Sequence, residues 1–504
     1  MSSPVMLIGI DSLPPELFEK WMAQGEMPNL SRLRNQSTFA IQKNFSLYRT
    51  ENSWLTFLQG CSAESSEEWG HQDYQVGDYA TTERASYGFS KYPPFYALCQ
   101  HLRVAVFDVP LTGLVENVNG LQVLGWGTEV NQCLRESSPP GLVGELIKRH
   151  GRHPVYDRVL KATDDSTTLN YRIPSIYDLK GLQELKERMI EAVGQRTEII
   201  LDLMRREAWD MMLCVYAEAH TALHLFWHLS QPHPLHESLA AQVHSDFLLE
   251  VVRAIDSGIG ILLAEMPAKQ HLLVFSPHGM QANTLDIYSM LFLPELLYRW
   301  STGHAALCEG ETGTPPPPLK LDYSRHWREE IWALRTRHGD AVLESPFQQE
   351  VRKDPLDWDP GNWYRSCWPR LRAFTLPGYS EGLVRINVAG RDGPGGIPAE
   401  QFDSVCTELI TLLHELKDVH SGQPIVAQVL RIRANPDEKD ASKPPADLMV
   451  CWREDVVTNV VEHHRHGRIG AAPYFRSGGH STAGFVMARG PGFEAGSRLE
   501  DVDA

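Results

Sequence analysis

The sequence predicts an α/β protein in which a mostly parallel central sheet carries helices on both faces. Residues 4–10 form a near-continuous apolar run that ends at Asp11, as a buried parallel strand does. Three further short apolar runs have the same character, and long amphipathic segments lie between them. Strands that alternate with helices are typical of a parallel sheet that is covered on both faces.

The predicted elements follow one another along most of the chain. After the first strand, Pro14 and Pro15 precede an amphipathic segment, because proline suits the first turn of a helix. The predicted helices are 16–24, 182–206, 243–266 and 399–417. The predicted strands are 5–10, 104–107, 211–216, 272–275, 382–388, 425–433, 448–452 and 485–488.

We expect a single catalytic domain that spans residues 1–504. Two irregular stretches, 60–179 and 283–366, are rich in turn-forming residues. The second contains consecutive prolines at 315–318, which fit neither a helix nor an interior strand. We expect both stretches to be insertions that form a cap over the active site, where substrate specificity usually resides.

The composition limits the class of function. The net charge is −17, whereas a nucleic-acid-binding protein needs a basic surface to displace counterions, so we expect no nucleic-acid partner. A small anionic substrate remains suitable, because bound metal ions supply a local positive field. We see no secretion leader, no apolar run of about 18 residues and no CxxC pair among the eight cysteines. We therefore expect a cytoplasmic protein without a membrane partner, and the oligomeric state is not specified.

Two polar residues lie where such a sheet positions its ligands. Asp11 follows the first predicted strand, and the carboxyl ends of parallel strands form the ligand-binding edge, although an aspartate there also caps helices. Thr50 lies in a loop that enters a predicted helix, whose free N–H groups stabilise an alkoxide or a bound oxyanion. Considered alone, Thr50 is also typical of a helix N-cap.

Five histidines are spaced like metal ligands or flank predicted strands. His220, His224 and His228 follow at intervals of four residues, and residues i and i+4 share one face of a helix. Either neighbouring pair can therefore bind one ion. His278 directly follows a predicted strand, and His480 lies in a glycine-rich loop that is also typical of a tight turn.

The order and local sequence of these residues resemble the alkaline phosphatase superfamily, in particular its branch of type I phosphodiesterases and nucleotide pyrophosphatases. The resemblance implies a three-layer α/β/α sandwich with a cap and a metal-dependent hydrolase activity. It covers most of the chain outside the two irregular stretches. The matching segments are 8–11, 27–33, 50–54 with Gly60, 220–227, 276–280, and 479–484 with 490–492.

The resemblance also implies two metal ions, often zinc, beside a nucleophilic threonine. The implied ligands are His220, His224 and His480 for one ion, and Asp11, Thr50 and His278 for the other. Two departures change this set, because His220 and Pro277 stand where relatives carry aspartates. Three imidazoles suit Zn²⁺, with Mn or Fe as further candidates. The loss of two negative charges weakens the attraction for cations, so we expect one or two ions.

The implied reaction is hydrolysis of a phosphate ester, with a phosphodiester favoured, through Thr50 as the nucleophile and a covalent phospho-threonine. Sulfatase chemistry is disfavoured, because 50–54 lacks the Cys- or Ser-x-Pro-x-Arg pattern. One alternative on the same fold is a phosphoryl-type transferase or other bond-cleaving enzyme of a specialised biosynthetic pathway. Another is a non-catalytic divergent member. The sequence does not identify the residues that determine substrate specificity.

Other residues have a candidate role and a simpler interpretation. Glu51 and Glu218 are candidate replacement ligands, but an exposed position near the site is the simpler interpretation of each. Arg476 and Arg391 are candidate anion contacts, for which the sequence favours a structural role. The tract 463–466 resembles a metal site but is also typical of a solvated surface cluster.

Overall fold

The structure is a computed structural model of the whole chain. It describes residues 4–44, 52–98, 100–127, 135–156, 158–160, 167–169, 173–267 and 270–503, with the backbone alone at 158–160, 167–169 and 503. Thr50 and Glu51 lie outside the described residues, so the predictions for these two positions are not addressed by the structure.

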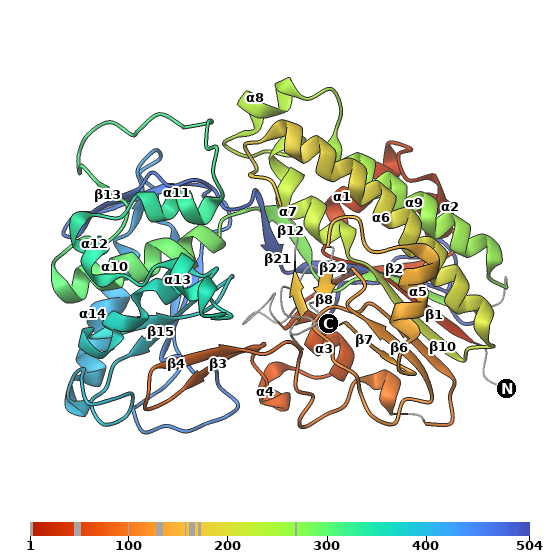
Figure 1. Cartoon of the computed structure of the whole chain (residues 1–504), viewed down its shortest axis with the longest axis horizontal. Helices are drawn as coiled ribbons and strands as arrows, with labels where there is room; N and C mark the ends of the chain where they lie inside the picture. Colours follow the sequence, from red (N-terminus) through yellow and green to blue (C-terminus); the bar gives the residue numbers. More distant parts are fainter. Residues whose placement is uncertain are drawn as a thin grey trace.

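The larger of two lobes is built on a nine-stranded sheet with the order β23-β2-β22-β11-β1-β10-β5-β6-β7 (Figure 1). β22 runs antiparallel to β11 and β2, and β7 antiparallel to β6, while the remaining neighbours are parallel. This confirms the predicted mostly parallel sheet. The strands are β1 Val5–Ile10, β2 Thr38–Lys43, β5 Val104–Phe107, β6 Gly120–Leu124, β7 Glu136–Ser138, β10 Met211–Tyr216, β11 His271–Ser276, β22 Ala483–Arg489 and β23 Val502–Asp503.

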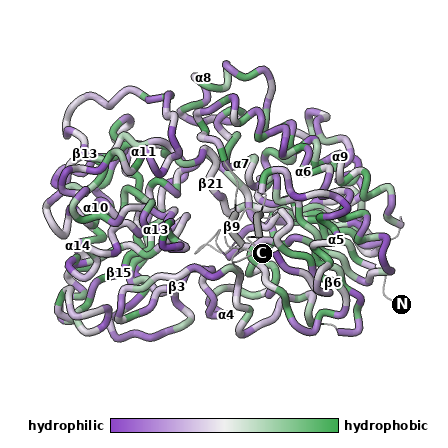
Figure 2. The backbone as a smooth tube through the Cα atoms, viewed as in Figure 1, coloured by the Kyte–Doolittle hydropathy of each residue, from purple (hydrophilic) through white to green (hydrophobic). Residues whose placement is uncertain are grey.

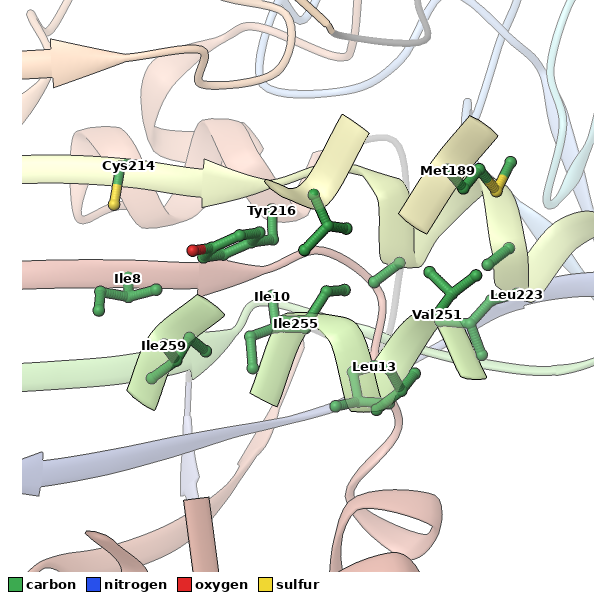
Figure 3. Close-up of a cluster of buried hydrophobic side chains, with 14 of the residues drawn as sticks. Ile8, Ile10, Leu13, Met189, Cys214, Tyr216, Leu223, Val251, Ile255 and Ile259 are labelled. Carbon is green, nitrogen blue, oxygen red and sulfur yellow. The ribbon is translucent and has the colours of Figure 1, made fainter. Parts of the chain in front are cut away.

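Helices cover both faces of this sheet because its central strands are apolar on both sides. Along β1, Ile8 and Ile10 pack into one hydrophobic cluster and Leu7 into another on the opposite face (Figure 3). The helices of the first face are α1 Pro15–Ala23, α2 Pro28–Arg34, α6 Leu179–Arg206, α7 Glu218–Ser230 and α9 Phe247–Glu265. The opposite face is covered by α3 Ser53–Gln59 and η1 Phe95–Ala97. The result is the three-layer α/β arrangement that the sequence predicts.

Capping residues determine where the two longest helices begin. The Asp178 side chain accepts the N–H of Gly181 at the start of α6, and the Asp246 side chain accepts that of Leu249 at the start of α9. α6 therefore starts a few residues before the predicted 182, and α9 a few after the predicted 243. No helix among the described residues has both the length and the apolar composition needed to cross a bilayer.

The smaller lobe has its own hydrophobic core, which is formed mainly by residues between 285 and 475 (Figure 2). It contains two four-stranded sheets, ordered β14-β15-β18-β17 and β13-β20-β19-β16. Their strands are β13 Glu309–Gly310, β14 Ala373–Leu376, β15 Gly382–Ile386, β16 Lys417–Asp418, β17 Val426–Arg431, β18 Leu448–Trp452, β19 Val460–His463 and β20 Gly467–Gly470. Its helices include α10 Leu293–Thr302, α11 Trp327–Ala333, α12 Arg337–Val342, α13 Pro346–Val351 and α14 Phe402–His414.

The stretch 60–179 contributes to both lobes. It supplies β5, β6 and β7 to the large sheet, together with α5 (Leu142–His150). It also contains the hairpin of β3 (Gln72–Gln75) and β4 (Ala80–Glu83), and Tyr79 between these strands packs into the core of the smaller lobe. A two-stranded ribbon, β12 (Gly279–Ala282) with β21 (Gly478–Ser481), lies beside α7 between the lobes (Figure 1).

Candidate metal centre

Three histidines from two distant parts of the chain converge at the carboxyl-end edge of the large sheet. His220 and His224 lie one turn apart on α7, which follows β10, and His480 lies on β21. The Nε2 atom of His220 is 2.7 Å from Nε2 of His224 and 3.0 Å from Nε2 of His480. One nitrogen from each ring lies within 4.8 Å of the other two. The structure thus brings together the three-histidine set that the sequence predicts.

His228 does not belong to this cluster, although its spacing from His224 is the same. Its Nδ1 atom is 2.9 Å from the Ser477 hydroxyl, and the ring is fully buried one turn further along α7. The direction of α7 therefore selects the pair His220 and His224 over the pair His224 and His228.

The hydrogen bonds around the cluster set the tautomers of two rings. Nδ1 of His224 is 2.7 Å from the carbonyl oxygen of Gly478, which can only accept, so Nδ1 carries the proton and Nε2 presents a lone pair. Nδ1 of His220 is 3.2 Å from Oδ2 of Asp11, which orients that ring in the same way. The Nε2 atoms of His220 and His224, 2.7 Å apart, thus present lone pairs on the same side, as two ligands of one metal ion do.

Burial keeps His224 and His480 neutral and ready to bind a metal. Removal from water lowers the pKa of His224 and of His480 well below the usual value, and the neighbouring Arg476 lowers both further. Burial also lowers the pKa of His278, whose ring centroid is 4.8 Å from that of His480. Neutral imidazole is the form that donates a lone pair to a metal ion.

Asp11 lies at the end of β1 beneath the cluster and does not cap a helix. Pro14 is the N-cap of α1, and that helix has no side-chain cap. Oδ1 of Asp11 accepts the indole N–H of Trp54 at 3.0 Å, while Oδ2 faces His220. Burial by itself raises the pKa of this carboxyl, but His220 and His278 outweigh it, so the pKa falls and Asp11 is ionised.

Gly9 allows Trp54 to reach Asp11. A Cβ atom on Gly9 would lie 3.2 Å from the Trp54 ring and 3.2 Å from Val215, closer than packed carbon atoms normally approach. The missing side chain lets the indole of α3 lie flat against β1, with its N–H directed at the carboxylate. Trp54 belongs to the matching segment 50–54, but its contact with Asp11 was not predicted from the sequence.

The second predicted ligand group is only partly assembled among the described residues. Nε2 of His278 lies 3.6 Å from Oδ1 of Asp11 and 3.4 Å from the Ser12 hydroxyl. Thr50 lies outside the described residues, and Pro277 offers no side-chain donor. The described donors at this position are therefore one carboxylate already bonded to Trp54 and His220, one imidazole and one hydroxyl, a weak set for a divalent ion.

Glu218 is buried in an ion-pair network, so the prediction of an exposed position is wrong. Its carboxylate pairs with Nε of Arg196 at 2.8 Å and with His153 at 3.2 Å. Arg196, which is 0% exposed, also pairs with Asp108 at 2.9 Å. Burial raises and Arg196 lowers the pKa of Glu218, and the net effect is a lowered pKa. This network fixes Glu218, the first residue of α7, two residues before His220. Because the Glu218 carboxylate is already paired with Arg196 and His153, it is not a metal ligand.

The two candidate anion-binding arginines have different environments. Arg391 pairs with Asp392 at 2.7 Å and with Asp447 at 2.7 Å, in the smaller lobe, as a structural arginine does. Arg476 lies instead at the histidine cluster, with Nη1 2.9 Å from Nε2 of His224. The sequence therefore assigns Arg391 correctly and misses the position of Arg476.

The histidine tract 463–466 lies in the smaller lobe. Nε2 of His463 is 3.1 Å from the Glu415 carboxylate, and Nδ1 of His464 is 3.7 Å from it. Arg465 pairs with the same carboxylate at 3.1 Å, so a guanidinium already supplies the positive charge that a metal would bring. The tract is separate from the cluster on α7.

Fold and site together define a three-layer α/β protein with a partly buried cluster of three imidazoles, a donor set that suits a transition-metal ion. No family model and no curated protein matches the sequence. The structure is similar to phosphonoacetate hydrolase from Sinorhizobium meliloti, in complex with phosphonoformate, with a TM-score of 0.47 and 12% identity over 99% of this chain and 90% of that one. It is also similar to murine ectonucleotide pyrophosphatase/phosphodiesterase 5, in an inactive variant in complex with AMP, with a TM-score of 0.42 and 10% identity over 100% of this chain and 92% of that one.

Both proteins belong to the alkaline phosphatase superfamily, which the sequence motifs resemble. Because both TM-scores are below 0.5 and both identities are low, the functional assignment rests on the residues of the site.

Proposed function

We propose that this chain is a metal-dependent hydrolase of phosphate esters that binds one divalent ion, zinc by preference, through His220, His224 and His480. The observation that carries the proposal is the convergence of three Nε2 atoms, from the buried His224 and the half-buried His220 and His480. Bound zinc would act as a Lewis acid toward a phosphoryl oxygen and lower the pKa of a coordinated hydroxyl group. A three-histidine set leaves a coordination position for such a ligand.

In this proposal Thr50 is the nucleophile and the favoured substrate is a phosphodiester, as the resemblance of 50–54 implies. The Thr50 oxygen forms a bond to phosphorus while the bond from phosphorus to the leaving alcohol breaks, and the alcohol takes up a proton. Water then attacks phosphorus, the bond to Thr50 breaks, and a phosphate monoester and a proton are released. Asp11 supports this chemistry by orienting His220.

The test of this function is hydrolysis that depends on the metal. Protein purified without chelators is analysed for metal content and assayed on bis(p-nitrophenyl) phosphate and p-nitrophenyl phosphate. We expect about one zinc ion per chain, faster turnover of the diester, and loss and recovery of turnover as the metal is removed and returned. Turnover only with an added acceptor alcohol would indicate a transferase, and protein without bound metal would contradict both enzymatic functions.

Replacing Thr50 by alanine is expected to lower kcat on the diester by about 100-fold or more, because the covalent route is lost. The metal content is expected to stay unchanged, since three histidines hold the ion without Thr50. The matched control is Thr50→Ser, which keeps a hydroxyl and should retain a measurable rate. Acid quenching followed by peptide mass spectrometry should detect the p-nitrophenyl phosphoryl group on residue 50 in the unmodified protein and in Thr50→Ser, but not in Thr50→Ala. Full activity of Thr50→Ala would contradict the assignment.

Replacing Asp11 by asparagine tests whether this residue orients His220 or binds an ion itself. The amide of asparagine has one acceptor oxygen where Asp11 uses two, one for Trp54 and one for His220, and the negative charge is gone. We expect the affinity for zinc to fall by about 10-fold, within the range for residues behind a metal ligand, while the protein still binds one ion. Competition with a coloured chelator measures the affinity. A drop from two bound ions to one would show instead that Asp11 binds a second ion.

A further inference from the structure

Arg476 is fixed beside the histidine cluster by contacts on three sides. Its Nε atom pairs with the Asp286 carboxylate, and its guanidinium carbon lies 5.6 Å from the centre of the Tyr379 ring. Nη1 lies 2.9 Å from Nε2 of His224. The side chain is 22% exposed.

Asp286, the partner of Arg476, is itself held rigidly. It is 3% exposed, and it accepts the side-chain N–H of Asn283 at 3.1 Å. The same amide group of Asn283 donates to the backbone carbonyl of Arg476 at 3.1 Å. A buried carboxylate with these bonds holds the guanidinium in one place, so a ligand that binds there does not have to order a flexible side chain.

Arg476 lies next to a nitrogen that would bind the metal ion, so two positive charges would be close together at this site. In the structure, Nη1–H donates to the lone pair of His224 Nε2, which is the lone pair that a bound metal would use. A bound metal ion would use this lone pair and so remove the acceptor that this N–H has in His224. A guanidinium and a divalent cation a few ångströms apart also repel each other unless an anion lies between them.

We propose that Arg476 is a catalytic residue that donates a hydrogen bond to a non-bridging oxygen of the substrate phosphoryl group at the three-histidine site. The inference rests on the proposed function and extends it, because it assigns a substrate contact to Arg476, for which the sequence favoured a structural role. The fixed positive charge of Arg476 compensates in part for a second metal ion, for which the described donors are few.

A small surface pocket, open to solvent, lies next to the cluster, with room for little more than one water molecule. His480 is one of its lining residues. Leu285 and Ser380 are two more, and they are the chain neighbours of Asp286 and Tyr379, which contact Arg476. Glu381 and Glu454 also line it. These two carboxylates repel an anion, so an anion near this pocket needs the positive charge of Arg476 and of a bound metal ion.

The test uses Arg476→Ala in the zinc-loaded protein, with inorganic phosphate as the probe. We expect the dissociation constant of phosphate to rise by about 10-fold and kcat/KM on bis(p-nitrophenyl) phosphate to fall by roughly 100-fold, with zinc content unchanged. Added guanidinium ion should restore part of the lost rate. Asp286→Asn keeps the guanidinium but loosens it, so its loss of kcat/KM should be smaller. The exposed Arg498→Ala is the control and should match the unmodified protein.

Phosphate affinity and kcat/KM of Arg476→Ala within twofold of the unmodified values would overturn the inference. Loss of zinc from both Arg476→Ala and Arg476→Lys would also overturn it, because Arg476 would then support the metal site and not the substrate. Phosphate binding is measured without turnover. If the unmodified protein hydrolyses no ester, the proposed function fails, while the effect of Arg476 on phosphate binding still tests the inference.

Discussion

Replacing His480 by alanine is expected to remove the bound metal ion and, with it, at least about 10³-fold of the hydrolytic rate, which corresponds to roughly 4 kcal/mol of transition-state stabilisation. His480 is the only member of the cluster that does not lie on α7. Without it, the two remaining imidazoles bind the ion through one helical turn alone, and zinc sites normally have three or four protein ligands. Elemental analysis of protein purified without chelators measures the first effect, and diester hydrolysis the second.

His228→Gln is the matched control for His480→Ala. His228 is a buried histidine on the same helix that contacts Ser477 and lies outside the cluster. Its replacement should leave the zinc content close to that of the unmodified protein. Circular dichroism and the midpoint of urea denaturation confirm that both variants are folded. If His480→Ala kept its full zinc content and rate, the three-histidine centre would be refuted.

Replacing Arg196 by methionine is expected to lower the free energy of unfolding by about 3–5 kcal/mol, a factor of roughly 10² to 10⁴ in the folding equilibrium. The substitution leaves the carboxylates of Asp108 and Glu218 buried without their common partner. It also removes hydrogen bonds to the carbonyl oxygens of Val215 and Gly127. Urea denaturation measures the effect, and zinc affinity should fall as well, because Glu218 begins the helix that carries His220 and His224.

Two controls separate this charge effect from a change of size. Arg498→Ala removes an arginine that pairs with Glu19 at the surface, and such pairs contribute at most about 1 kcal/mol. The triple variant Arg196→Met, Asp108→Asn, Glu218→Gln removes all three charges and should recover part of the lost stability, because no ion is then left unpaired. If Arg196→Met denatured at the same urea concentration as the unmodified protein, the network would have no stabilising role.

Much of the fold could be predicted because its signals are local. The apolar runs of β1, β10 and β11 and the amphipathic patterns of α6 and α9 report burial within short segments, and the structure has these elements within a few residues of the predicted bounds. The capping residues explain the differences, since Asp178 and Asp246 start their helices at positions that hydrophobic periodicity does not specify.

The candidate site was predictable only in part. The motifs name His220, His224, His278, His480 and Asp11, but not which nitrogen faces which partner. The contact of Asp11 with His220 depends on β10 being the neighbour of β1 in the sheet. The packing of α6 against β10 and α7 buries Glu218 against Arg196, which made an exposed interpretation of Glu218 wrong.

By itself, the sequence determined that this chain is an α/β protein with histidines and an aspartate at strand ends and a resemblance to metal-dependent hydrolases. Periodicity, proline positions and motif spacing are properties of neighbouring residues, so they can be recognised in the sequence alone. Only the tertiary structure decided that His228 is excluded from the cluster, that Trp54 bonds Asp11 across Gly9, and that Arg476 lies beside His224. These facts depend on the order of strands and on the packing of α7 against β21, which join residues that lie far apart in the chain.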